Sequence, residues 1–153
     1  MNNKIVIIGA GSLQFGLGSV GSVITSEVLQ GSTISLHDIN AANLDLVTQA
    51  CREAIHEKNL EFELESTTKR KQALKEANFI INSIEIPPRF KWFELDYQIP
   101  RKFGNKQLYG ENGGPGGLFH SLRIIPPILE ICEDIKKICP SALLINYSNP
   151  MSR

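Results

Sequence analysis

The sequence predicts an α/β fold, a doubly wound parallel sheet of about five strands with helices on both faces. Two observations support this fold class. Short apolar runs that fit buried strands alternate along the chain with longer stretches of helical periodicity. The first apolar run, residues 4–8, leads directly into a glycine-rich turn. In such a sheet the crossovers are right-handed, and ligands bind at the carboxyl ends of the strands.

Composition and charge exclude several classes of protein. The chain has 153 residues, which is enough for one domain with a sizeable core. Sixteen basic and sixteen acidic residues cancel, unlike the charge of a protein that binds nucleic acid. No apolar run approaches a membrane span and no signal-peptide core precedes the first strand, so we expect a soluble, cytoplasmic protein. The three cysteines form no Cys-x-x-Cys motif, and we interpret them as reduced thiols.

The segment K-I-V-I-I-G-A-G-S-L-Q-F-G, residues 4–16, predicts a strand, a tight turn and a helix. Gly9 permits the turn, Gly11 lets the backbone approach a pyrophosphate, and N–H groups of the next helix face that anion. Gly16 comes later than the third glycine of the usual G-x-G-x-x-G pattern, so a turn without a ligand is the alternative. We expect the helix over residues 12–29.

Asp38 strengthens the hypothesis of dinucleotide binding. It follows a short strand expected over residues 33–37, where Rossmann-like folds place an acid that binds the ribose hydroxyls. A carboxylate there would repel a 2′-phosphate, which favours NAD over NADP. The alternative is that Asp38 only caps the helix beginning near Asn40.

The next segments continue the alternation of helix and strand. Residues 41–58 carry apolar side chains at helical spacing, residues 60–66 alternate as an edge strand would, and residues 69–76 predict a short helix. A buried strand is expected over residues 79–84, which places Ser83 at the rim of the nucleotide crevice.

Proline and glycine dominate the second half of the chain. A helix over residues 90–98 should end at Pro100. The glycines within residues 113–117 cost much conformational entropy, so we expect a functional loop there, with a flexible linker as the alternative. Residues 118–138 predict one long helix with a kink or break near Ile124, because Pro126-Pro127 follow.

A fifth buried strand is expected over residues 141–146, and its last residue is Asn146. A strand at this position would leave an unpaired apolar edge over residues 142–147. We therefore predict self-association, through this edge or through the face beside the glycine loop, and hence a homo-oligomer.

Three motifs resemble glycoside hydrolase family 4. They are G-A-G-S-x-x-F at residues 9–15, G-E-N-G-G-P-G-G-L-F-H-S-L-R at residues 110–123, and L-L-I-N-Y-S-N-P-M-S at residues 143–152. The family includes 6-phospho-glucosidases, α-galactosidases and α-galacturonidases, and the resemblance implies NAD and manganese as cofactors. It also implies a redox route. Bound NAD⁺ takes a hydride from the sugar C3, a base removes the C2 proton, the glycosidic oxygen leaves, water adds, and the hydride returns.

The resemblance implies roles for individual residues. Glu111 would lie near the sugar, and Asn149 would hold sugar hydroxyls beside the metal and the nicotinamide, although an Asx turn before Pro150 is the alternative. Arg89 would bind a 6-phosphate, unless it is a solvated surface arginine. The role of His120 stays open. The expected cofactor contacts, from the resemblance and the strand ends together, are Gly9, Gly11, Ser12, Phe15, Asp38, Ser83 and Asn146.

Members of that family are much longer than this chain, and the resemblance places their metal ligands and proposed catalytic base after Arg153. We therefore interpret residues 1–153 as one NAD-binding domain that is catalytically incompetent alone, with a glycoside, which could be 6-phosphorylated, as the substrate of the whole enzyme. Two alternatives are the cofactor domain of an NAD-dependent 2-hydroxy-acid dehydrogenase and a stand-alone nucleotide-binding module.

Overall fold

The computed structural model describes residues 2–12, 15–106 and 112–149. Their contacts divide the chain into two compact units. The sheet unit comprises Met1–Ser83 and Asp134–Asn146, and the helical unit comprises Ile84–Glu133 and Tyr147–Arg153. The single domain expected over residues 1–153 stays a prediction.

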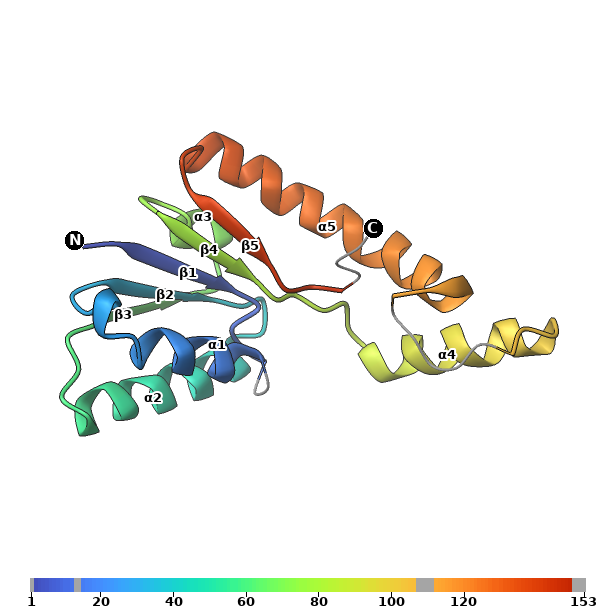
Figure 1. Cartoon of the computed structure of the whole chain (residues 1–153), viewed down its shortest axis with the longest axis horizontal. Helices are drawn as coiled ribbons and strands as arrows, with labels where there is room; N and C mark the ends of the chain where they lie inside the picture. The colour runs from blue at the N-terminus through green and yellow to red at the C-terminus, as the bar shows by residue number, and fades with distance from the viewer. Residues whose placement is uncertain (1, 13–14, 107–111, 150–153) are drawn as a thin grey trace. The chain divides into compact units, whose positions relative to one another are not determined.

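The sheet unit is built on five parallel strands in the order β3-β2-β1-β4-β5 (Figure 1). This order confirms the predicted doubly wound fold, in which the chain starts at the centre and moves first to one edge and then to the other. The strands are β1 (Lys4–Ile8), β2 (Thr33–His37), β3 (Glu63–Thr67), β4 (Phe79–Asn82) and β5 (Leu143–Asn146).

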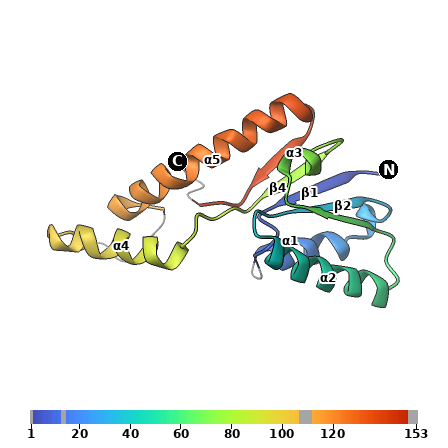
Figure 2. The same ribbon diagram turned by 180° about the vertical axis from the view of Figure 1, so that it is seen from behind.

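Helices cover both faces of this sheet, as predicted. Helices α1 (Phe15–Ile24) and α2 (Ala41–Glu57) lie together on one face, and the short α3 (Arg70–Ala73) lies on the other (Figures 1 and 2). Asn40 caps α2, because its side-chain oxygen accepts a hydrogen bond from the Asn43 N–H at 3.1 Å. The observed helix α2 ends one residue before the range 41–58 that its amphipathic pattern predicted.

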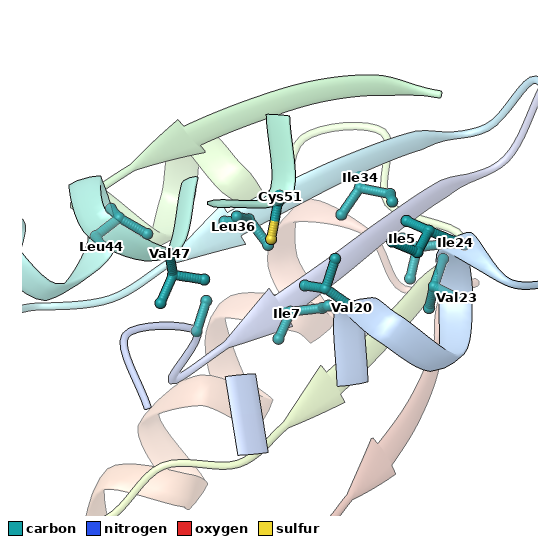
Figure 3. Close-up of a cluster of buried hydrophobic side chains, with 11 residues drawn as sticks. Ile5, Ile7, Val20, Val23, Ile24, Ile34, Leu36, Leu44, Val47 and Cys51 are labelled. Atoms are coloured by element: carbon teal, nitrogen blue, oxygen red, sulfur yellow. The ribbon is translucent and has the colours of Figure 1, made fainter. Parts of the chain in front are cut away.

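Side chains from β1, β2, α1 and α2 form the hydrophobic core of the sheet unit (Figure 3). Ile7 and Leu36, which pair across β1 and β2, are fully buried, and Val47 of α2 packs in the same cluster. Cys51 also belongs to it, and burial raises the pKa of its thiol. Cys51 is therefore a core side chain and not a reactive thiolate.

The helical unit contains α4 (Arg89–Lys102) and residues 114–133 of α5 (Gly114–Ile138). The solvent-exposed face of α5 is apolar in its first half and charged in its second. The exposed apolar side chains are Leu118, Phe119, Leu122, Ile125 and Leu129, and the exposed charged ones are Glu130, Glu133, Lys136 and Lys137. None of the helices in the described residues is apolar over a length that would cross a lipid bilayer.

The structure contradicts the expected end of α4 at Pro100 and the expected break of α5 near Ile124, whereas a kink in α5 stays a prediction. Pro100 lies inside α4, which continues to Lys102, because the turn after it closes through hydrogen bonds from Phe103 N–H and Asn105 N–H to the Pro100 carbonyl. Helix α5 runs unbroken past Ile124, which is 1% exposed, because Pro126-Pro127 remove only two donors from a long helix anchored by its buried face.

The prediction of a functional loop over residues 113–117 is also wrong for most of that range. Residues 114–117 form the first turn of α5, which begins before the predicted residue 118. Pro115 suits a first helical turn, where its missing N–H costs no hydrogen bond. The fifth strand was expected to be buried, but β5 lies at the sheet edge, where Leu143 is 57% and Ile145 39% exposed.

Other element ends also differ from the predictions. Helix α1 stops at Ile24 and a separate 3-10 turn covers Glu27–Leu29, where one helix over residues 12–29 was expected. The Thr25 hydroxyl donates to the Gly21 carbonyl at 2.9 Å, a local bond that competes with continuation of the helix. Helix α3 covers only four residues of the expected 69–76.

Candidate functional site

The glycine turn follows β1 and is tied to the end of β2. Gly9 has a φ of 87°, a left-handed conformation that favours glycine. The N–H groups of Gly9 and Ala10 both donate to the carbonyl of His37, at 2.9 and 3.0 Å. The turn therefore holds the carboxyl ends of β1 and β2 together, at the edge of the sheet where such folds bind ligands.

Gly11 and Asp38 contact each other directly. The Gly11 N–H donates to Asp38 Oδ2 at 2.8 Å, and the Asn40 N–H donates to Asp38 Oδ1 at 2.8 Å. A Cβ at position 11 would lie 2.8 Å from that carboxylate and 3.0 Å from the Asn43 Cβ. A side chain at position 11 would fit only if the Asp38 carboxylate moved, and two backbone N–H groups hold that carboxylate at the end of β2.

These bonds bear on both interpretations of Asp38. Asn40, not Asp38, supplies the side chain that caps α2. Asp38 supports the same turn by accepting from the Asn40 N–H. Each carboxylate oxygen has a second lone pair, so a held Asp38 can still accept hydrogen bonds from ribose hydroxyls.

Gly16 provides the close contact between helix and strand that the third glycine provides in dinucleotide-binding turns. A Cβ at this position would lie 2.0 Å from the Ala10 carbonyl oxygen. The Gly16 N–H donates to the Ser12 carbonyl at 2.8 Å. The late third glycine therefore makes the usual packing contact from a later position in the sequence.

The other expected cofactor residues also lie at strand or helix ends of the sheet unit. Ser12 Oγ accepts from the Phe15 N–H at 3.2 Å, so Ser12 caps the first turn of α1, and the Phe15 side chain is exposed. The N–H of Ser83, just after β4, donates to the Ile8 carbonyl at 2.9 Å. Asn146 ends β5, and its Oδ1 accepts from Asn82 Nδ2 at 2.8 Å.

Asn82 is a residue that the sequence analysis did not single out. It ends β4, pairs in register with Ile8, and is fully buried. A signal was available, because an amide side chain in the otherwise apolar run F-I-I-N is out of place unless it has a partner. Its hydrogen bond to Asn146 joins the ends of β4 and β5.

His37 ends β2 next to Asp38 and is 4% exposed. Its Nδ1 lies 3.0 Å from the Thr67 carbonyl, which can only accept, so Nδ1 carries the proton. Burial lowers the pKa of His37, and the nearby Arg70 adds to this, although the Thr67 hydrogen bond and the Asp38 charge oppose it. The folded protein therefore favours a neutral imidazole.

This pKa shift predicts acid sensitivity of the sheet unit. The unfolded histidine takes up a proton near pH 6.5 whereas the folded one does so only at lower pH, so the free energy of unfolding should fall as pH drops below about 6.5. Urea unfolding at several pH values measures this slope. The His37→Gln variant should show a shallower slope, whereas His56→Gln, which alters an exposed histidine of α2, should match the parent. Identical slopes for the parent chain and both variants would show that His37 does not cause the pH dependence of stability.

The helical unit contains a surface pocket of its own. Its lining comes from the start of this unit, from α4 and from α5, namely Glu85, Ile86, Arg89, Trp92, Phe93, Asp96, His120 and Arg123. Arg89 Nε lies 3.5 Å from Glu85 Oε2, and Arg123 pairs with Asp96. His120 Nε2 donates to the Asn149 carbonyl at 3.1 Å.

The pocket brings together residues that the resemblance had suggested separately. Arg89 lines it, and Asn149 contacts its lining residue His120 through the backbone. Glu111 lies outside the described residues. Sequence reasoning missed Trp92, Asp96 and Arg123. Asp96 and Arg123 lie 27 positions apart on two helices, so their pairing leaves no local pattern in the sequence.

Among residues 2–12, 15–106 and 112–149, no group of three or more His, Cys, Asp or Glu side chains could hold a metal ion. Cys139 is buried, and burial raises the pKa of its thiol.

Comparison with known proteins gives one family. A model of the family 4 glycosyl hydrolases matches residues 4–153. The α-glucosidase of Erwinia rhapontici is 54% identical over 153 residues, which are 100% of this chain and 34% of that protein. Two solved structures of a 6-phospho-α-glucosidase from gut microorganisms are also similar.

The first of these structures, in complex with NAD and Mn²⁺, has a TM-score of 0.86 at 24% identity and covers 98% of this chain. The second, in complex with NAD and glucose-6-phosphate, has a TM-score of 0.84 at 26% identity and also covers 98% of this chain. The match spans 34% of each solved chain. This chain therefore spans about a third of the length of the relatives it matches.

Proposed function

The chain belongs to family 4 of the glycosyl hydrolases, and on that premise we propose that it is the NAD-binding domain of a glycosidase. The observation that carries the proposal is the contact between Gly11 and Asp38. It joins the glycine turn after β1 to an acid at the neighbouring strand end, and a Cβ at position 11 would press against that acid. The dehydrogenase alternative has no support from the family match.

The residues at the strand ends fit NAD. Gly9 gives the turn its left-handed conformation, and the turn would bring its backbone close to a pyrophosphate. Helix α1, which packs close to the turn through Gly16, would direct its N-terminus at the same anion. Asp38 would accept hydrogen bonds from the adenosine ribose, and its charge would exclude a 2′-phosphate. Ser83 and Asn146, at the ends of β4 and β5, would line the crevice farther along the cofactor.

Bound NAD⁺ would supply the oxidising equivalent that lets a glycoside be cleaved by elimination instead of direct displacement. This chain would contribute by fixing the position of the cofactor. The substrate of the whole enzyme would be a glycoside, with or without a 6-phosphate. Two relatives support this range by their names, an α-glucosidase and a 6-phospho-α-glucosidase. No step is assigned to a metal in this chain.

Calorimetric titration of the chain with NAD⁺ and NADP⁺ tests the cofactor role. We expect saturable binding of NAD⁺, with NADP⁺ at least about tenfold weaker because the 2′-phosphate meets Asp38. The Asp38→Asn variant should bind NAD⁺ about tenfold more weakly than the parent chain. The difference between its affinities for NAD⁺ and NADP⁺ should be smaller than in the parent.

Asp45→Asn is the matched control, since it removes one charge from an exposed position of α2 near the same end. It should leave both affinities unchanged. A folded sample that binds no NAD⁺, or an Asp38→Asn variant that binds both cofactors like the parent, would refute the proposal.

A further inference from the structure

The last residues of the five strands form one row across the carboxyl edge of the sheet. The register pairs Thr67 with His37, His37 with Ile8, Ile8 with Asn82, and Asn82 with Asn146. Ile8 directly precedes the glycine turn, so it marks the middle of this row. The two asparagines therefore lie level with the turn proposed for the pyrophosphate, on the side of β1 away from β2 (Figure 1).

Asn82 is an unfavourable residue at its position if stability alone decides. It is 0% exposed and ends the otherwise apolar strand β4. A buried amide loses its hydrogen bonds with water, and the bond that it makes inside the protein does little more than offset that loss. Apolar side chains of similar shape at both positions of such a pair can be equally stable or more so. Stability therefore does not explain why an amide lies at the end of β4.

The bond between the two amides determines how Asn146 is oriented. Asn82 Nδ2 donates to Asn146 Oδ1 at 2.8 Å, between side chains 64 positions apart in the sequence. Asn82 is fully buried, whereas Asn146 is half-buried, so a ligand at the strand end can reach Asn146. With Oδ1 turned toward Asn82, the Nδ2 end of the Asn146 amide, which carries two donor hydrogens, points the other way.

The place of this pair in the sheet selects one half of the cofactor. Asp38, the proposed partner of the adenosine ribose, follows β2, and the glycine turn follows β1. A dinucleotide that crosses the carboxyl edge through these two places extends over the ends of β4 and β5 with its nicotinamide nucleoside. We propose that Asn82 is a positioning residue, which holds the Asn146 amide so that its Nδ2 donates to the nicotinamide nucleoside of NAD. This inference rests on the proposed cofactor role and extends it to the second half of the cofactor.

Two ligands separate the halves of the cofactor. NAD⁺ contains the nicotinamide nucleoside, whereas ADP contains only the adenosine and both phosphates. Calorimetric titration with each ligand compares the parent chain with Asn82→Leu, a side chain of similar size that donates no hydrogen bond. The variant should bind NAD⁺ about tenfold more weakly and ADP with the affinity of the parent. A thermal melt checks that each sample is folded, and Asn82→Ala, which adds no bulk, is used if the leucine variant does not fold.

Asn78→Leu is the matched control. It changes the same residue type just before β4, where Asn78 Oδ1 accepts from the Lys4 N–H of the neighbouring strand at 2.7 Å. This variant also breaks a bond between neighbouring strands, but at the opposite edge of the sheet. Its affinities for NAD⁺ and for ADP should therefore both equal those of the parent.

A double variant shows whether Asn82 acts through Asn146. Asn146→Ala should itself bind NAD⁺ about tenfold more weakly than the parent and leave ADP affinity unchanged. If Asn82 only positions Asn146, adding Asn82→Leu to Asn146→Ala costs little further NAD⁺ affinity. Losses that multiply, to about a hundredfold, would show that the two residues act independently and would contradict the positioning role.

The proposal also fails if Asn82→Leu binds NAD⁺ like the parent, or if it loses affinity for NAD⁺ and ADP by the same factor. In either case the parent chain still binds NAD⁺, so the proposed cofactor role stands. A parent chain that binds neither ligand refutes the cofactor role and this inference with it.

Discussion

Replacing Gly16 by alanine should destabilise the protein by about 3 kcal/mol, at the upper end of the cost of overpacking. The new Cβ would lie 2.0 Å from the Ala10 carbonyl oxygen and 2.7 Å from its carbon. Both atoms are backbone, so they cannot rotate away as a side chain would. Either α1 must move off the sheet or the turn after β1 must change shape. Chemical unfolding with urea measures the loss.

The same helix contains the control. A Cβ at Gly18 or at Gly21 would have nothing within 4 Å, so an alanine at either position meets open space. Gly18→Ala should stabilise the protein by about 0.5–1 kcal/mol through helix propensity and reduced entropy of the unfolded chain. If Gly16→Ala were as harmless as Gly18→Ala, the close contact between α1 and the turn would be disproved.

Replacing Gly11 by alanine should reduce NAD⁺ affinity by about a hundredfold while leaving the chain folded. The difference from Gly16 lies in what the methyl meets. At position 11 it meets mainly the Asp38 carboxylate at 2.8 Å, a side chain that can turn aside. That movement would break the Gly11 N–H bond to Asp38 and displace the acid from the position proposed for ribose binding.

Calorimetry with NAD⁺, together with a thermal melt of the same sample, separates the two effects. Gly21→Ala serves as the control, since it adds the same methyl on α1 where nothing lies within 4 Å. It should bind NAD⁺ like the parent chain. A folded Gly11→Ala variant with undiminished affinity would mean that the pyrophosphate does not lie against this turn.

The central elements could be predicted because their signals are local and strong. Strand β2 lies where its apolar run predicted it, and α2 differs from its predicted range by one residue, because both are defined by burial periodicity. The contact between Gly11 and Asp38 follows from the same regularity, since parallel strands bring their carboxyl ends to one edge.

The wrong predictions came from applying local rules for proline and glycine where the packing of the folded chain decides the structure. Proline was expected to end α4 and to kink or break α5. In α4, Pro100 lies in the last turn, so the helix extends only two residues beyond it, and in α5 the packing of the buried face outweighs two missing donors. Glycine at position 114 was interpreted as loop, although it begins a helix. The pocket of the helical unit could not be predicted, because pairing of Arg123 with Asp96 depends on how two helices pack.

Helix α5 changes character along its exposed face, from the leucines and isoleucine between Leu118 and Leu129 to the charges from Glu130 onward. The two halves should respond to salt in opposite ways. Sulfate strengthens contacts between apolar surfaces, whereas any salt screens contacts between charges. Self-association of this chain through the apolar first half of α5 should therefore strengthen as ammonium sulfate is added. Contacts made through the charged second half should weaken.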